Sequence, residues 1–304
     1  MISGLPKKRC KKLYEMFKQV DRLALGTAQF GMAYGIANSS GEPSQDAIDE
    51  MLLMAHKSGI RTLDTAYAYG KSEERIGSFV RRSGKEFNII SKMPDEPGPL
   101  SAFINSSLKR LAADSIYGYM LHSFNSIKSR NHIMEEFDAI KAKGIINATG
   151  VSLYHTQELD YIIENNIRVD ILQIPYNIFD QRFEPYFPQL KNMGIKIYAR
   201  SVFLQGLFFL EQARIEKEFS MAKDTIDKVC RIASEINVPV HSLCLSFALL
   251  NPDIDKVIIG VDSLGQLKKN LEALRSIKKV KAVYEILKSL KLHNEKVILP
   301  YKWN

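Results

Sequence analysis

Three stretches of the sequence share one rhythm: KSGIRTLD at 57–64, AKGIINATG at 142–150 and KNMGIKIYA at 191–199. In each stretch a helical pattern runs into a glycine, and a short run rich in apolar and β-branched residues follows. Glycine readily adopts the left-handed backbone that ends a helix, so Gly59, Gly144 and Gly194 mark predicted helix ends. Each stretch therefore reads as a helix that passes through a tight turn into a buried strand.

The same unit repeats along most of the chain. Short apolar runs predict strands at 23–25, 62–64, 88–91, 116–121, 147–151, 170–174, 195–199 and 257–260. Helical patterns predict helices near 45–58, 72–82, 101–112, 131–143, 155–165, 183–193, 221–236 and 263–273. Alternating strands and helices indicate a parallel sheet, and eight units are the number that closes a (β/α)8 TIM barrel. We expect a single α/β domain.

The barrel is expected over residues 21–280, with a basic extension at 1–20 and a C-terminal helix and tail at 281–304. The terminal helix is predicted at 281–293, and 202–219 forms the longest insertion. The segment Lys11–Val20 fits a short amphipathic helix that plugs the barrel, or a loose extension; the sequence leaves both open. Ser44, Ser72 and Thr156 are expected to begin helices as caps, with Glu158 in the first turn of the last one.

Composition limits the class of protein. The 304 residues are 45% hydrophobic and 25% charged, which are ordinary globular values and exclude a disordered or collagen-like chain. No apolar run approaches the ~20 residues that span a bilayer, so no membrane association is expected. The N-terminus lacks the apolar core of a signal peptide. Cys10, Cys230 and Cys244 are odd in number and far apart, which favours a reducing, cytoplasmic location over a disulfide framework.

The net charge of +8 raises the question of nucleic-acid binding. The excess lysine and arginine gather at 7–12 and at 268–291, while the middle of the chain mixes both signs. Such end clusters are typical of solvated helix faces. We therefore expect no nucleic-acid partner, although salt-dependent binding through the terminal lysines is the alternative.

Ionisable side chains stand at consecutive predicted strand ends. Asp64 ends the second strand, Lys92 the third and His122 the fourth, and Tyr69 follows closely after Asp64. Catalytic groups of such barrels lie at the carboxyl ends of the strands. A buried lysine needs a partner, which Asp64 supplies, and an adjacent ammonium is expected to lower the pKa of Tyr69. These four residues suggest a proton-transfer site.

The other five histidines fall in predicted helices, loop starts or the tail, and we expect them to be structural or exposed. They are His56, His132, His155, His241 and His293. No cluster of metal ligands and no pair of nucleophile and base competes with the four strand-end residues, so no metal site is expected.

The sequence resembles the aldo-keto reductase superfamily. The resemblance is carried by LGTAQFGMAYGI at 25–36, GIRTLDTAYAYGKSEERIG at 59–77, IISKM at 89–93, LKRLAADSIYGYMLHS at 108–123, GVSLY at 150–154, ILQIPYNIFD at 171–180, QGL at 205–207 and VIIGVDSLGQLKKNLEAL at 257–274. It implies a catalytic tetrad of Asp64, Tyr69, Lys92 and His122. The implied reaction is hydride transfer from a nicotinamide cofactor to an aldehyde or ketone, with Tyr69 as proton donor.

The resemblance also implies where the cofactor binds. No GxGxxG motif follows the first strand, so the site is not a Rossmann fingerprint. Ser152 and Gln173 would bond the carboxamide of the nicotinamide, and Arg200 stands where many relatives stack a tyrosine on that ring. The remaining implied cofactor residues are Gly26, Thr27, Asp64, Ser201, Leu204, Gln205, Gly206, Gly260, Val261, Ser263, Gln266 and Asn270.

Departures from the family pattern bear on cofactor choice. Leu153 replaces an asparagine that bonds the carboxamide, Asp262 replaces a basic residue and Gln266 an arginine at the adenosine end. An aspartate there repels a 2′-phosphate, whereas Lys268 and Lys269 are able to compensate. We expect NADP(H) in preference to NAD(H).

The expected partner is a small-molecule carbonyl compound. The resemblance places Phe30, Tyr34, Tyr67 and Phe124 around it, and small aldehydes, sugars and sugar derivatives all stay open. The alternative function is a cofactor-binding regulatory subunit with little turnover. A monomer or a weak homo-oligomer is expected.

Overall fold

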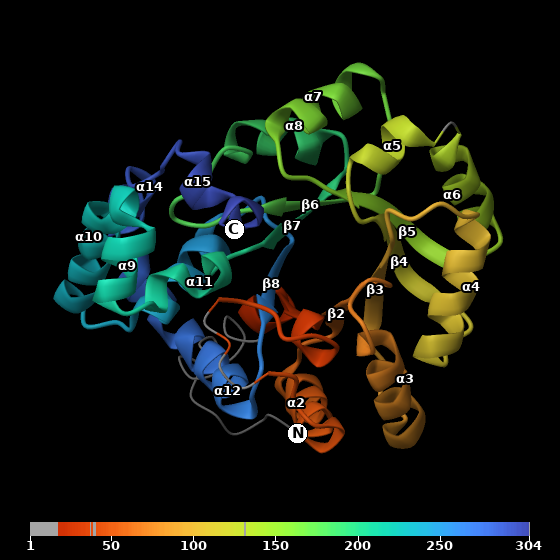
Figure 1. Cartoon of the computed structure of the whole chain (residues 1–304), viewed down its shortest axis with the longest axis horizontal. Helices are drawn as coiled ribbons and strands as arrows, with labels where there is room; N and C mark the ends of the chain where they lie inside the picture. Colours follow the sequence, from red (N-terminus) through yellow and green to blue (C-terminus); the bar gives the residue numbers. More distant parts are fainter. Residues whose placement is uncertain (1–17, 37, 39–40, 131, 304) are drawn as a thin grey trace, which may run out of the picture.

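The structure is a computed structural model that describes residues 18–36, 38, 41–130 and 132–303. Eight parallel strands follow one another around a closed barrel, in which β1 pairs with both β2 and β8 (Figure 1). The strands are β1 (Leu23–Gly26), β2 (Thr62–Asp64), β3 (Asn88–Met93), β4 (Ile116–Leu121), β5 (Ile146–Ser152), β6 (Ile171–Pro175), β7 (Lys196–Arg200) and β8 (Lys256–Gly260). The predicted single-domain (β/α)8 barrel is confirmed.

Helices surround the barrel on its outside (Figure 1). The α-helices are α2 (Gln45–Ser58), α3 (Ser72–Ser83), α4 (Leu100–Leu111), α5 (Asn125–Ser129), α6 (Ile133–Ala142), α7 (Thr156–Glu164), α8 (Phe187–Asn192), α9 (Gln212–Glu218), α10 (Lys223–Glu235), α11 (Val240–Leu250), α12 (Leu264–Ala273), α13 (Ile277–Lys281), α14 (Tyr284–Lys288) and α15 (Glu295–Ile298). Short 3-10 turns are η1 (Ala28–Phe30), η2 (Glu184–Tyr186), η3 (Leu204–Phe209), η4 (Ser220–Ala222), η5 (Leu274–Ser276) and η6 (Pro300–Lys302).

The strands are buried on both faces. One apolar cluster of strand residues includes Ala24, Ile90, Met120, Ile171 and Tyr198. A much larger cluster joins the remaining strand residues to the helices. Because the helices cover the outer face, the strand sequences are nearly continuous apolar runs rather than alternating ones. This packing fixes the strand ends, which carry the candidate site.

The glycine signal for helix ends is confirmed. Gly59 ends α2 with a φ of 101°, and Gly144 and Gly194 follow α6 and α8 with φ values of 73° and 76°. Ser44 caps α2 by accepting a hydrogen bond from the backbone N–H of Ala47. The repeating glycine of the three opening stretches therefore has the conformational role expected of it.

Two predicted caps are wrong by one residue. The cap position of α3 is Lys71, and the hydroxyl of Ser72 donates instead to the carbonyl oxygen of Thr27 at 2.9 Å. At α7 the cap position is His155, while Glu158 accepts hydrogen bonds from backbone N–H groups of the entering turn. The shift at Ser72 matters, because this hydroxyl ties the loop after β2 to the end of β1.

The C-terminal third of the chain differs most from expectation. The sequence did not indicate α11, which is almost wholly buried. The single helix predicted at 281–293 is wrong, since α14 ends at Lys288 and residues 289–294 are not helical. The insertion at 202–219 contains η3 and α9. Figure 1 shows α9, α10, α14 and α15 gathered beside α11, at one side of the barrel.

Most of the predicted Lys11–Val20 helix lies outside the described residues. Within the described part, residues 18–20 are helical and Val20 packs into the core. Among the described helices, no single one has the length and apolar character needed to cross a membrane. One bent pair, Ser220–Glu235 with Val240–Leu250 at 93°, meets those two criteria together.

Candidate active site

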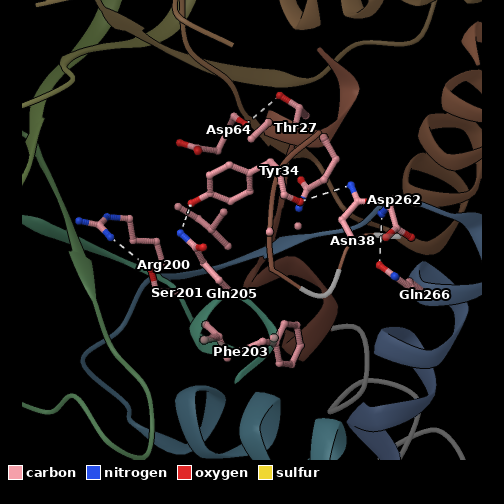
Figure 2. Close-up of a pocket in the computed structure, with 18 of the residues that line it drawn as sticks. Thr27, Tyr34, Asn38, Asp64, Arg200, Ser201, Phe203, Gln205, Asp262 and Gln266 are labelled. Atoms are coloured by element: carbon pink, nitrogen blue, oxygen red, sulfur yellow. Dashed lines mark hydrogen bonds between the residues drawn. The ribbon is translucent and has the colours of Figure 1, made fainter. Parts of the chain in front are cut away.

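A cavity of about 450 Å³ opens at the carboxyl ends of the strands (Figure 2). Residues from six strands and from the loops after them line it. The lining includes these residues expected from the sequence: Gly26, Thr27, Tyr34, Asp64, Tyr69, His122, Ser152, Gln173, Arg200, Ser201, Gln205, Gly206, Gly260, Gln266 and Asn270. Residues that lie up to 244 positions apart, Gly26 and Asn270, thus contribute to one hollow.

Beneath the cavity lies a buried ion pair between β2 and β3. The ammonium of Lys92 donates to both carboxylate oxygens of Asp64 at 2.9 Å and to the carbonyl oxygen of Thr65 at 2.8 Å. The Asp64 carboxylate also accepts a 2.7 Å hydrogen bond from the amide of Gln173. An ammonium has three protons, so these contacts satisfy Lys92 completely. Burial nevertheless lowers the pKa of Lys92, against the stabilising charge of Asp64.

Tyr69 lies above this pair. The Lys92 nitrogen is 5.3 Å from the centroid of its ring, and the ring meets the imidazole of His122 edge to face with centroids 5.6 Å apart. The expected lowering of its pKa is wrong. Burial raises the pKa of Tyr69 well above its ordinary value, and the Asp64 charge raises it further. Among the described residues, the hydrogen-bond partners of the Lys92 ammonium are Asp64 and Thr65 rather than the phenol. The phenol is protonated at neutral pH.

Two glycines allow the Tyr69 loop to pack against the loop after β1. A Cβ atom on Gly31 would lie 1.9 Å from the carbonyl oxygen of Tyr69, and one on Gly70 would lie 2.2 Å from the carbonyl oxygen of Gly31. Gly70 also has a φ of 51°. Ser72 adds hydrogen bonds to Thr27 and Thr65 in the same region. This close backbone approach fixes the loop that carries the phenol.

His122 follows directly after β4 and is half-buried at the cavity wall. Burial, the ammonium of Lys92 and the guanidinium of Arg200 together lower its pKa to about 4. The imidazole is therefore neutral at physiological pH. A neutral imidazole has one N–H donor, which suits it to bond a substrate oxygen next to Tyr69.

Arg200 ends β7 and is held firmly. Its guanidinium donates to the hydroxyls of Ser152 and Ser201 at 3.3 and 3.2 Å and to the carbonyl oxygen of Leu153 at 2.9 Å. The same group lies 4.0 Å from the ring centroid of Tyr154. Sequence reasoning missed Tyr154 as a cavity residue; its place two residues after the end of β5 was the available signal.

The opposite end of the cavity lies at the start of α12. Figure 2 shows Arg200 at one side of the pocket and Asp262 with Gln266 at the other. The Gln266 side chain accepts from the backbone N–H of Asp262 at 3.2 Å. Lys269 and His241 also line the cavity here. His241 was expected to be structural or exposed, and its position on the unforeseen helix α11 explains why it was missed.

The loop after β7 forms the cavity wall between these ends. Four of its residues have left-handed backbone: Ser201, Leu204, Gln205 and Gly206, with φ of 58°, 47°, 52° and 98°. Such conformations cost about 1–3 kcal/mol each in residues with a side chain and gather at binding sites. The amide of Gln205 donates to the hydroxyl of Tyr34 at 3.2 Å, as the dashed line in Figure 2 shows. This bond joins the loops after β1 and β7.

Several residues that the resemblance assigned to the site are not among those that line the cavity. Leu204 and Val261 are wholly buried in the apolar core, and Ser263 caps α12 by accepting from the backbone N–H of Gln266 at 3.3 Å. Leu204 and Val261 pack behind the loops that line the cavity.

The aromatic residues expected around the substrate also differ from prediction. Of the four, Tyr34 lines the cavity. Phe30 is in η1 and packs into the core with no exposed surface. Tyr67 lies under the guanidinium of Arg110, 3.9 Å from its ring centroid, and Phe124 meets Tyr161 edge to face. Placing Phe30, Tyr67 and Phe124 on the cavity wall is wrong, because each ring packs against another part of the protein.

The donors around the cavity fit an anionic dinucleotide. Ser152 and Ser201 offer hydroxyls, Gln173 and Asn270 offer amides, and Lys269 offers a positive charge. The ten-residue helix α12 begins at the same end of the cavity as Lys269 and Asn270, and helix N-termini favour phosphate groups. Within the described ranges, no group of three or more His, Cys, Asp or Glu side chains is arranged to hold a metal ion.

Known proteins resemble this chain in sequence and in fold. Residues 22–291 match the Aldo/keto reductase family. The chain is 26% identical over 270 residues to the uncharacterized oxidoreductase YqkF of Bacillus subtilis, covering 79% of this chain and 85% of YqkF. It is 23% identical over 300 residues to the NADH-specific methylglyoxal reductase of Escherichia coli, covering 84% and 90%.

A solved structure supports the same fold. The aldo-keto reductase AKR11C1 of Bacillus halodurans superposes with a TM-score of 0.66 at 19% identity, covering 86% of this chain and 91% of that one. At this identity the likeness concerns the fold alone, and the family match over residues 22–291 carries the assignment. The chain belongs to the aldo/keto reductase family, whose members are generally NAD(P)H-dependent oxidoreductases.

Proposed function

We propose that this protein reduces a small aldehyde or ketone to an alcohol, with NADP(H) as the preferred cofactor and Tyr69 as the proton donor. One observation carries the proposal. A phenol and a neutral imidazole, 5.6 Å apart between ring centroids, stand over the buried Asp64–Lys92 pair at one end of a cavity lined with phosphate and amide binders.

The chain's own residues provide a proton and orient the substrate. His122 donates a hydrogen bond that holds the carbonyl oxygen close to the Tyr69 hydroxyl. Tyr69, protonated because of its raised pKa, then gives its proton to the oxygen as negative charge develops there. A bound dihydronicotinamide supplies the hydride. The Lys92 ammonium, 5.3 Å from the ring centroid of Tyr69, stabilises the phenolate that this proton transfer leaves.

The raised pKa of Tyr69 keeps the phenol protonated at neutral pH. Reduction of a carbonyl group uses this form as the proton donor, and oxidation of the alcohol uses the phenolate as the proton acceptor. The pKa shift therefore supports Tyr69 as a proton donor near neutral pH.

Lys269 supports the preference for NADP(H). Of the two lysines considered for this role, Lys269 lines the cavity and Lys268 is not among its lining residues. Lys269 therefore takes the role of the missing arginine at the adenosine end, where its charge offsets Asp262. Ser152 and Gln173, which sit side by side in the register of β5 and β6, would hold the carboxamide at the other end. One relative is specific for NADH, so both cofactors belong in the test.

The proposal is tested by titrating the purified protein with NADPH and NADH while following cofactor fluorescence. Micromolar binding of NADPH, weaker binding of NADH and consumption of NADPH with small carbonyl compounds are expected. Methylglyoxal is a reasonable first substrate, because a similar protein reduces it. Binding without turnover across a panel of aldehydes and ketones would favour a regulatory subunit. Absence of binding by either cofactor would contradict the proposal.

A further inference from the structure

Among the described residues, the proposed catalytic end of the cavity holds one cation that no carboxylate pairs with, the guanidinium of Arg200. The charges of Asp64 and Lys92 cancel within their own pair, and His122 is neutral. Arg200 is different, because its guanidinium donates to two hydroxyls and one carbonyl oxygen, all of which are uncharged. Among the described residues, no carboxylate forms an ion pair with its guanidinium. Arginine stays protonated at every physiological pH, so the site carries a fixed positive charge.

The reaction requires the redox ring of the cofactor to lie at this same end. Tyr69 protonates the oxygen of the carbonyl group, and the carbon bonded to that oxygen accepts the hydride. Reacting atoms must come within roughly 3–3.5 Å of one another. The nicotinamide ring therefore has to share the part of the cavity that Tyr69, His122 and Arg200 line.

The two redox states of that ring differ in charge. The oxidised nicotinamide is a cation, whereas the reduced ring is neutral. Arg200 cannot turn away easily, because it is anchored to Ser152, Leu153 and Ser201 and stacks on Tyr154. A cation enclosed beside this guanidinium is repelled more strongly than it would be in water, since the surrounding protein screens charge less.

We propose that Arg200 makes this site discriminate between the redox states of its cofactor, so that the reduced dinucleotide binds more tightly than the oxidised one. The inference rests on the proposed function and adds a consequence for turnover. The protein holds reduced cofactor until a substrate arrives, and it releases the oxidised form readily afterwards. Arg200 is a specificity-determining residue for the cofactor, separate from the proton-transfer role of Tyr69.

The test compares dissociation constants of the oxidised and reduced cofactor, measured by calorimetry, in the wild type and in Arg200→Gln. Glutamine keeps hydrogen-bonding groups but removes the charge. We expect the ratio of oxidised to reduced dissociation constants to fall by about tenfold in Arg200→Gln. Arg200→Lys, which keeps the charge, should retain most of the ratio. An unchanged ratio in a folded Arg200→Gln protein would overturn the proposal.

A second test uses the wild-type protein alone and compares the two dinucleotides with ADP-ribose. ADP-ribose, with or without a 2′-phosphate to match the cofactor, has the same adenosine and diphosphate but no nicotinamide. We expect the reduced dinucleotide to bind more tightly than ADP-ribose. The oxidised dinucleotide should bind no more tightly than ADP-ribose. An equal increase in affinity over ADP-ribose for both dinucleotides would contradict the role of Arg200. If neither dinucleotide binds, the proposed function fails as a whole, which distinguishes that outcome from failure of the role of Arg200 alone.

Discussion

The ammonium of Lys92 lies 2.9 Å from both carboxylate oxygens of Asp64, and this buried pair forms part of the cavity wall through Asp64. Each member makes the burial of the other tolerable, because an unpaired charge is costly in the interior. The carbonyl of Thr65 and the amide of Gln173 complete the hydrogen bonding. The pair is thus both part of the proposed active site and a structural element of the barrel.

Lys92→Met should destabilise the fold by about 3–5 kcal/mol, because it leaves the Asp64 carboxylate buried without a counterion. Urea denaturation measures the loss. The double variant Lys92→Met with Asp64→Asn removes both charges, so it should recover a substantial part of the lost stability. A double variant that is no more stable than Lys92→Met would contradict the ion-pair interpretation.

The lowered pKa of His122 implies that the protein loses stability in acid. His122 has a pKa of about 4 in the folded protein, against 6.5 when unperturbed. Between these values the unfolded chain binds more protons, so the free energy of unfolding falls as the pH decreases from about 6.5 to about 4. We expect this residue to contribute roughly 1–2 kcal/mol to that fall, allowing for its partial exposure.

Urea denaturation of the wild type and of His122→Asn across that pH range isolates this contribution. Asparagine does not titrate, so the variant should lose less stability between pH 6.5 and pH 4. The other titrating groups are common to both proteins and cancel in the comparison. Parallel pH dependences for the two proteins would show that His122 is not held neutral by its surroundings.

Lys269→Ala should weaken NADPH binding by about tenfold while leaving NADH binding within about twofold, because the lysine charge acts on the 2′-phosphate that only NADPH carries. Lys268→Ala is the matched control, since Lys268 is exposed and is not among the cavity-lining residues. Fluorescence titration measures the affinity of each variant for NADPH and for NADH. Equal weakening of NADPH and NADH binding in Lys269→Ala would assign the lysine to a part common to both cofactors.

The hydrogen bond between Tyr34 and Gln205 connects two loops over the cavity. Tyr34→Phe removes it but keeps the ring, and a hydrogen bond of this kind contributes about 0.5–1.5 kcal/mol. Bound cofactor should therefore dissociate roughly 2–10 times faster, as measured by rapid mixing with a competitor. Tyr186→Phe, which loses a hydrogen bond to Asp160 away from the cavity, should not change the rate. Identical rates in all three proteins would show that the two loops do not retain the cofactor.

The sequence predicted the barrel well because its strands are continuous apolar runs between glycine-ended helices. It failed at α11, where the run Ser242–Leu249 is buried on every side and so shows no helical alternation of apolar and polar residues. It also failed at 281–293, where apolar residues favoured one helix but the chain turns after Lys288. Periodicity identifies helices with one exposed face, which α11 lacks, and it does not show where the chain turns after α14.

The candidate site was predictable where strands position it and less so where loops do. Asp64 and Lys92 lie on neighbouring strands, so parallel pairing brings them together. Phe30, Tyr67 and Phe124 lie after strand ends, where the loop path decides which way a ring points, and the sequence does not specify that path. The pKa of Tyr69 was also mispredicted, because burial of the phenol and the nearby Asp64 charge raise it, and the sequence did not show how deeply the ring is buried.

The central claim is that Tyr69 gives the proton in carbonyl reduction, and Tyr69→Phe tests it most directly. The comparison is the turnover number of this variant with those of the wild type and of Tyr117→Phe. Tyr117 bonds to Lys196 near the amino end of β4, away from the cavity, and is the matched control. We predict that Tyr69→Phe lowers turnover by about 10²–10⁴-fold with cofactor affinity preserved, while Tyr117→Phe stays near wild type. Turnover by Tyr69→Phe within about twofold of wild type would contradict the account.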